Sequence, residues 1–142
     1  MKKIYLLDTN IVSEFSKENP NPQVLEFYKA RNNLCAISAI TWQELNRGVK
    51  RMPEGKKKNN IMNFIKNLKK NMEIIPYDEF SAQICGELQA SAETAGSKLS
   101  YYDSQIGAAA ISNGMVLVTH NTADFEFMKE KAFLHVEDWF TA

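Results

Sequence analysis

Cysteine and long apolar runs are both scarce in this sequence. The two cysteines, Cys35 and Cys85, are too few for a disulfide framework and lack the paired spacing of a zinc site. Buried free thiols in a reducing cytoplasm are therefore expected. The apolar run near the N-terminus stops at Asp8, which makes it too short for a signal-peptide core or a membrane span. These features predict a cytoplasmic protein with no membrane segment.

An excess of charge of one sign is also missing. The chain has 17 basic and 17 acidic residues and a net charge of zero, so affinity for nucleic acid would have to come from local clusters. With 142 residues, 44% of them hydrophobic, it can fill one core and is too short for two comfortable domains. We therefore expect a single domain over residues 1–142.

Short apolar segments alternate with stretches of helical periodicity along the chain. Residues 4–7 are apolar without a period of two, which favours a parallel strand covered on both faces. Further short strands are predicted at residues 34–38, 74–76, 115–119 and 133–136. This alternation predicts an α/β fold with a central, mostly parallel sheet flanked by helices.

Four carboxylates stand near the predicted junctions of strands and helices. Asp8 and Asp124 follow strands, Asp103 begins a helix, and Glu44 lies in the helix after the second strand. Parallel strands share one carboxyl edge, so we expect these four side chains to gather there. Each acid taken alone could equally be a helix cap, a partner of a helix dipole or a solvated residue, and that alternative stays open.

Carboxylates that lie close together repel one another and raise each other's pKa, so a cluster of them needs a cation. Mg²⁺ and Mn²⁺ prefer oxygen ligands and keep some of their water molecules. One such water can act as the nucleophile in phosphodiester cleavage. The acidic cluster therefore predicts metal-dependent hydrolysis.

The same residues carry a resemblance to a known family. Residues 6–10, 41–45 and 102–106, and residues 117–121 with Asp124 and Phe125, resemble the PIN-domain ribonucleases in the right order over nearly the whole chain. The closest similarity is to the VapC toxins of bacterial toxin–antitoxin pairs. The resemblance implies a PIN-like three-layer α/β/α fold and a Mg²⁺- or Mn²⁺-dependent endoribonuclease, with transfer RNA as a substrate expected at the family level.

The resemblance also implies roles for individual residues. Asp8, Glu44, Asp103 and Asp124 would be the catalytic metal ligands, supported by the polar residues Thr9, Asn10, Thr119 and Asn121. It further implies a small antitoxin partner, a homodimer, and a higher assembly with the antitoxin. Two positions depart from the family pattern, because His120 stands where Arg is frequent and Gly107 where Ala is common. His120, beside the acidic cluster, is a candidate RNA-binding residue, although this departure leaves its contact with RNA open.

One stretch of the chain is strongly basic. Residues 46–72 hold nine of the 17 basic residues and a single acid, Glu54, and are predicted to form a helical hairpin. Arg47 and Arg51 follow Glu44 by about one and two helical turns, so they could carry RNA phosphates towards the metal. Lys57 and Lys58 are placed in the link between the helices and are expected to matter less. A solvated hairpin without any ligand explains the run equally well.

Two other classes of protein gather acids around Mg²⁺ at strand ends. A receiver-type signalling domain needs an acidic pair after its first strand, whereas this chain has one Asp followed by Thr9 and Asn10. A haloacid-dehalogenase-like phosphatase needs Asp-x-Asp at the same place, where Asn10 is the third residue. A receiver-like or phosphatase-like Mg²⁺-binding domain without nuclease activity is the alternative to the ribonuclease.

We expect the ribonuclease to be inhibited by another protein, since nothing in the sequence resembles a built-in lid. A basic side chain of an antitoxin could fork onto the carboxylates while its apolar part lies in a groove. The candidate walls of that groove come from the two helices of the basic hairpin: Trp42, Leu45, Val49, Phe64, Ile65 and Leu68.

Overall fold

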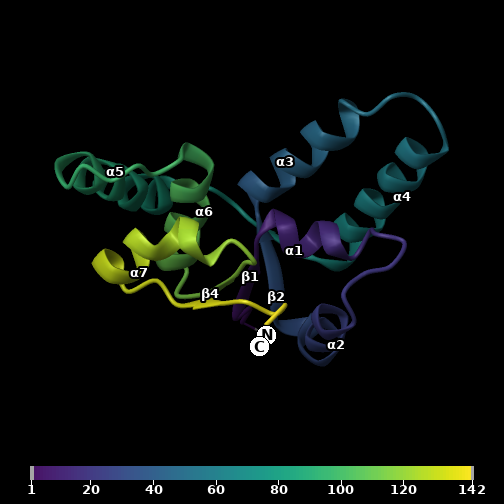
Figure 1. The fold of residues 1–142 in the computed structure, drawn as a ribbon, viewed down its shortest axis with the longest axis horizontal. Coiled ribbons are helices and arrows are strands. Elements are labelled where there is room, and N and C mark those ends of the chain that lie inside the picture. Colours follow the sequence, from purple (N-terminus) through teal and green to yellow (C-terminus); the bar gives the residue numbers. More distant parts are fainter. Residues whose placement is uncertain (1, 142) are drawn as a thin grey trace.

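A five-stranded sheet runs through the middle of the molecule, and all of its strand pairs are parallel (Figure 1). The computed structural model describes residues 2–141. In chain order the strands are β1 (Tyr5–Leu7), β2 (Cys35–Ser38), β3 (Glu73–Ile75), β4 (Val116–Val118) and β5 (Val136–Glu137). They lie side by side in the order β3-β2-β1-β4-β5. The parallel sheet predicted from the sequence is confirmed, with β1 at its centre.

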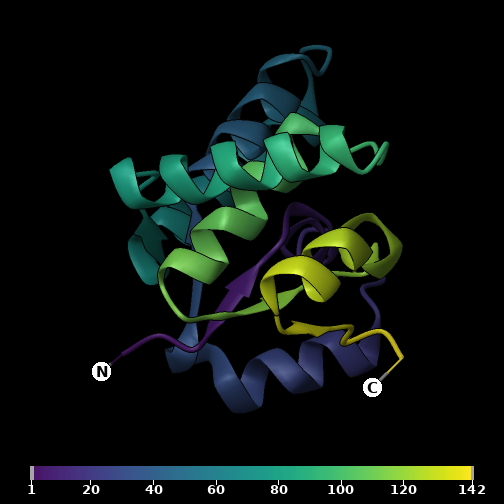
Figure 2. The same ribbon diagram turned by 90° about the vertical axis from the view of Figure 1, so that its left-hand side faces the viewer.

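Helices cover both faces of this sheet. In chain order they are α1 (Thr9–Glu14), α2 (Pro22–Arg31), α3 (Ala39–Lys50), α4 (Lys56–Asn71), α5 (Glu79–Thr94), α6 (Tyr101–Ser112) and α7 (Glu126–Ala132), with short 3₁₀ helices η1 (Asn32–Leu34) and η2 (Thr122–Phe125). Figure 1 shows α5, α6 and α7 on one side of the strands and α1, α2 and α4 on the other, and Figure 2 looks onto the first group. Within residues 2–141, none of the helices has the length and apolar character needed to cross a membrane.

Consecutive residues of β1 point into two separate cores. Leu6 packs in a core with residues of α5, α6 and α7, including Ile106 and Met128. Leu7 packs in the other core with residues of α1, α2, α3 and α4 and with Trp139. Leu6 and Leu7 are both fully buried, which explains why this strand has no polar alternation.

Two of the strands pass directly into helices at the carboxyl edge of the sheet. Asp8 caps α1, and the Ser38 side chain caps α3 by accepting a hydrogen bond from the Thr41 backbone N–H at 3.0 Å. Because no loop intervenes, the first turns of α1 and α3 are held at that edge. The side chains that these turns carry are therefore placed by the sheet itself.

The packing of α6 against α7 depends on a glycine. A Cβ atom at Gly107 would overlap the Met128 sulfur of α7 and would also lie 3.1 Å from its methyl carbon. Met128 is fully buried in the same core, so it cannot simply swing into solvent. The glycine in place of the alanine common in the resembling family is thus matched to a methionine on the neighbouring helix.

The last strand does not lie where the sequence pattern predicts it. The prediction was residues 133–136, whereas β5 spans Val136–Glu137. Phe133 adopts a left-handed backbone conformation, with φ 56°, that ends α7, and its side chain is 88% exposed. The apolar character of this segment therefore marks the end of a helix as well as a short strand.

Two lysines of the basic hairpin also lie elsewhere than predicted. Lys57 and Lys58 were expected in the link between two helices, but α4 already begins at Lys56. Lys58 is only 8% exposed, and its ammonium lies 2.7 Å from a carboxylate oxygen of Glu54. The lysine run is therefore the first turn of a helix, and one of its charges is neutralised locally.

Candidate active site

Asp8 lies in the middle of the carboxyl edge and is 5% exposed. One carboxylate oxygen accepts a hydrogen bond from the Thr9 backbone N–H at 2.8 Å, and the other accepts from the Thr119 hydroxyl at 2.8 Å and the Asn10 amide at 3.1 Å. Burial raises the pKa of Asp8 above its ordinary value, the bonds from Thr119 and Thr9 oppose the shift, and the charge of Asp103 adds to it. Asp8 therefore caps α1 and is also a buried carboxylate whose ionised form is destabilised by its surroundings.

Glu44 reaches the same edge from α3. One of its carboxylate oxygens accepts a hydrogen bond of 2.8 Å from the Thr9 hydroxyl, which ties α3 to the start of α1. Burial is the main reason that the pKa of Glu44 is raised; the charges of Asp8 and Asp103 add to the shift, while Thr9 and Arg47 oppose it. Glu44 is thus a half-buried member of the acidic group and not an ordinary solvated helix residue.

Asp103 and Asp124 come from the other side of the sheet. Asp103 lies in the first turn of α6, where its backbone N–H donates to the Ser100 hydroxyl at 3.0 Å. Its pKa is raised by burial and by the charge of Asp124, against the hydrogen bond of Ser100. Asp124 is exposed in η2. Both acids line one cleft of about 830 Å³ that also contains Lys98 and Phe127.

The four predicted carboxylates thus form a chain of mutually repelling charges. Glu44 is raised in pKa by Asp8 and Asp103, Asp8 by Asp103, and Asp103 by Asp124. Across residues 2–141, however, no three acidic, His or Cys side chains stand close enough to hold a metal ion in the positions they now occupy. The donor set nevertheless suits a hard divalent cation, because it offers only oxygen atoms and its charges destabilise one another.

A network of polar side chains supports Asp8, the buried member of the four carboxylates. The Asn10 amide nitrogen donates to the Thr119 hydroxyl at 3.2 Å, and the Asn121 backbone N–H donates to the same oxygen at 3.1 Å. Thr119 is fully buried and donates in turn to Asp8. Asn10 and Thr119 therefore take part through their side chains, whereas Asn121 takes part through its backbone.

The predicted RNA contacts lie beside the acids without joining them. Arg47 is exposed on α3 and Arg51 is exposed directly after its last residue, and the charge of Arg47 lowers the pKa of Glu44. His120 follows Thr119 directly, and its ring is held by Asp138 and Phe140 of the C-terminal segment. Sequence reasoning missed these last two residues, because no periodicity or spacing connects them to His120.

An apolar groove reaches the acids from the side opposite the Asp103 cleft. It has a volume of about 390 Å³ and lies between α1, α3 and α4, with Thr9 and Glu44 at one end. Four of the six predicted wall residues line it, namely Leu45, Val49, Phe64 and Ile65. The other two, Trp42 and Leu68, pack against the core beside it.

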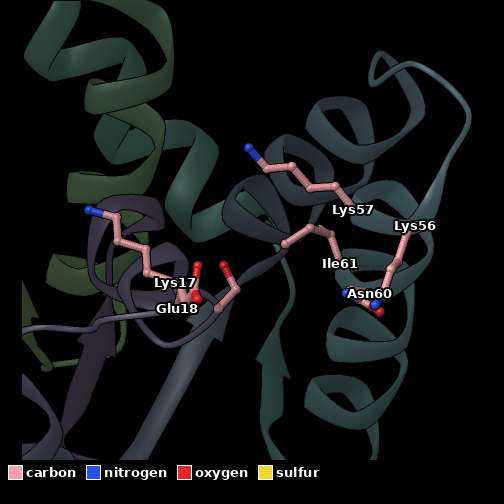
Figure 3. Close-up of a pocket in the computed structure, with 7 residues that line it drawn as sticks. Lys17, Glu18, Lys56, Lys57, Asn60 and Ile61 are labelled. Carbon is pink, nitrogen blue, oxygen red and sulfur yellow. The ribbon is translucent and has the colours of Figure 1, made fainter.

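A basic opening adjoins this groove at the end of α1. It has a volume of about 800 Å³ and is lined by Lys17, Lys56 and Lys57 and by one acid, Glu18, with Lys57 shared between the opening and the groove. Lys17 is already paired with Glu14 at 2.8 Å. Figure 3 shows Lys57 and Ile61 extending from α4 on the side that faces α1 and α3. The groove thus contains one positive side chain, Lys57, and one carboxylate, Glu44.

Comparison with known proteins decides the family. Residues 5–131 match the PIN domain. The chain belongs to the PIN-domain family. This PIN domain is 31% identical over 125 residues to VapC ribonuclease Y4jK of Sinorhizobium fredii, covering 85% of this chain and 89% of that protein. It is 29% identical over 137 residues to the tRNA(fMet)-specific endonuclease VapC of Shigella flexneri, covering 95% and 97%.

The shape of the PIN domain agrees with this relationship. A solved structure of FitAB bound to a DNA fragment superposes with a TM-score of 0.86 at 29% identity, and the match covers 96% of each chain. The PIN-like α/β/α fold implied by the sequence resemblance is thereby confirmed.

Proposed function

We propose that this PIN-domain protein is a divalent-metal-dependent endoribonuclease of the VapC toxin type. The observation that carries the proposal is the chain of four repelling carboxylates at the carboxyl edge of the sheet. Its similarity to proteins named ribonuclease and endonuclease supports RNA as the substrate and makes the receiver-like and phosphatase-like alternatives less suitable. Residues 1–142 would act as one functional domain.

The cation in this proposal is Mg²⁺ or Mn²⁺, held by Asp8, Glu44, Asp103 and Asp124. When bound, it supplies positive charge to the scissile phosphate and lowers the pKa of a water nucleophile. The protein's own contribution is orientation. Thr9 fixes the Glu44 carboxylate, while Asn10 and Thr119 fix the carboxylate of Asp8, with Asn121 completing the network.

The two clefts suit different partners. The cleft at Asp103 and Asp124 contains Lys98 among its acids, so with a bound cation it would suit the RNA backbone, with Arg47 and Arg51 supplying positive charge beyond Glu44. Transfer RNA is the substrate class that the relative from Shigella flexneri suggests. The apolar groove suits a segment of a small antitoxin, whose terminal basic side chain would pair with Glu44.

Assembly and location complete the proposal. Phe80 lies in the first turn of α5, Tyr101 and Tyr102 begin α6, and these aromatic side chains have exposed fractions of 62%, 76% and 40%. One of these two separate sites would serve a homodimer within a larger complex with the antitoxin. The free and buried thiols of Cys35 and Cys85 suit the reducing cytoplasm, where RNA and antitoxin are present.

The decisive experiment is cleavage of RNA by the purified protein with Mg²⁺, with Mn²⁺ and with excess chelator. Cleavage is expected with either ion and should disappear with the chelator. The variant Asp103→Asn should be inactive, while Glu130→Gln, a change of an exposed acid on α7, should leave cleavage intact. Full cleavage in the chelator would contradict the proposal, as would hydrolysis of a small aryl phosphate without any cleavage of RNA.

A further inference from the structure

The side chain of His120 is held from two sides and open on a third. Its Nδ1 lies 3.1 Å from one carboxylate oxygen of Asp138, and its ring stacks on Phe140 with 4.0 Å between the ring centroids and 29° between the planes. The side chain is nevertheless 48% exposed. The ring is thus held in one orientation, at a cost in side-chain entropy, while about half of it stays open to a ligand.

The residues that hold the ring are themselves anchored. The Asp138 carboxylate accepts a hydrogen bond of 2.9 Å from the Phe140 backbone N–H. Trp139, between them, is fully buried, and its backbone carbonyl accepts a bond of 3.0 Å from the Gln23 side chain on α2. The C-terminal segment therefore presents Asp138 and Phe140 to His120 in a fixed geometry.

The same histidine is connected to the acidic group through its backbone. The His120 N–H donates to the Asn10 side-chain oxygen at 2.9 Å, and the Asn10 amide donates to Asp8 at 3.1 Å. Thr119, the preceding residue, donates to Asp8 directly. These bonds fix the position of His120 relative to the Asp8 carboxylate at the centre of the site.

Asp138 determines which ring nitrogen is available to a ligand. Because a carboxylate can only accept, it selects the form of the ring with a proton on Nδ1, and the nitrogen left for other partners is Nε2. A phosphate oxygen can also only accept, so a contact with phosphate needs the ring with protons on both nitrogens, in which Nε2–H is a charge-assisted donor.

We propose that Nε2 of His120 binds a backbone phosphate of the RNA beside the scissile bond, and that Asp138 and Phe140 are positioning residues for this contact. The inference rests on the proposed ribonuclease function. It extends the substrate surface from the acids along the carboxyl edge to the C-terminal segment that holds Asp138 and Phe140.

Two isosteric variants separate the phosphate contact from the structural one. In His120→Gln the amide nitrogen reaches the place of Nε2, whereas in His120→Asn it reaches only the place of Nδ1 and keeps the bond to Asp138. Kinetics on a short single-stranded RNA with Mg²⁺ should show KM raised about 10-fold for His120→Asn, with kcat within about twofold, and a KM within about threefold of the unchanged protein for His120→Gln. His135→Ala is the control, because His135 is exposed next to β4 at the amino side of the sheet.

A second measurement follows the positioning role. Nitrogen NMR of the imidazole should show a proton held on Nδ1 in the unchanged protein, and Asp138→Asn should shift the Nδ1 signal and raise KM about threefold. Equal KM values for His120→Asn and the unchanged protein would overturn the inference, as would equal damage from Asn and Gln. Turnover by the unchanged protein tests the ribonuclease separately, so failure of the one is distinguishable from failure of the other.

Discussion

Asp8 is both a helix cap and a member of the acidic site, two roles that the sequence offered as alternatives. Its carboxylate caps α1, as an isolated Asp after a strand normally does, and it is also repelled by Asp103 in a buried position. A cap needs only one of the two oxygens, which leaves the other for Thr119 and Asn10. The cap therefore fixes the geometry that the chemistry uses.

The first prediction concerns Asp8→Asn. Cleavage should fall by at least about 100-fold, because one ligand charge is lost at the centre of the site. The Asn oxygen can still accept from Thr9, but its amide would face the amide of Asn10, so the relief of repulsion and the lost bond offset each other. We expect the free energy of unfolding to change by less than about 1 kcal/mol. Chemical denaturation measures this, and a loss of several times that size would show that Asp8 is mainly structural.

The second prediction concerns pH. The pKa values of Asp8, Glu44 and Asp103 are raised, so the folded protein holds these protons more tightly than the unfolded chain. Stability of the metal-free protein from these groups is therefore greatest below the ordinary pKa of a carboxyl group and declines as pH rises through the raised values. Thermal melts should show this decline in the unchanged protein, a smaller one in Asp103→Asn, and recovery at neutral pH on adding Mg²⁺. An unchanged melt with Mg²⁺ would argue against a cation site.

At the scale of elements, the contact between α6 and α7 predicts that the effect of Gly107→Ala on stability changes sign when Met128 is removed. Gly107→Ala should improve helix propensity by about 1 kcal/mol but force Met128 out of its place, so the net effect in the unchanged protein is loss of stability. In a Met128→Ala background the overlap is gone, and the same change should stabilise by about 1 kcal/mol. Urea denaturation of the four proteins measures the coupling. Equal effects in both backgrounds would show that Met128 does not restrict position 107.

The fourth prediction is that RNA is bound by the basic residues at the end of α3. Arg47→Glu together with Arg51→Glu should weaken RNA binding and make the salt dependence shallower by about two units of slope, because two phosphate contacts are removed. Lys29→Glu with Arg31→Glu changes the same charge in the last turn of α2, which leads to the amino edge of the sheet. Titration of labelled RNA at several salt concentrations distinguishes them. Equal losses from both pairs would indicate a diffuse field.

At the scale of the whole molecule, the groove between α1, α3 and α4 predicts that antitoxin binding can be removed without loss of RNA cleavage. Gly48 lines this groove, and a Cβ there would meet no atom within 4 Å, so a side chain can be added without strain. Gly48→Gln should fill the groove, keep RNA cleavage and abolish inhibition by the co-expressed antitoxin, whereas Gly48→Ala should bind it normally. Growth assays and co-purification provide the measurement. Tight antitoxin binding by the Gln variant would place the interface elsewhere.

The sequence was sufficient for the first four strands and for the helices up to α6, because buried parallel strands and amphipathic helices leave clear periodic patterns, but it did not predict α7. The role of the four acids as metal ligands stays a prediction. It could not supply contacts between distant segments. Asp138 reaches His120 only through the tertiary fold, and Thr9 meets Glu44 from another helix. It also misplaced Lys58, since the run of lysines gave no sign that one of them would be buried against Glu54.

The central position of β1 has a consequence for how the protein is made. The strand that carries Asp8 is synthesised first, but Thr119, which bonds to it, is 111 residues away, and β4 beside it is also late. At about 5–20 residues per second, roughly 5–20 s pass on the ribosome between the two. A chain translated only as far as α6 lacks both Thr119 and β4, so under the proposed function it could not yet cleave RNA.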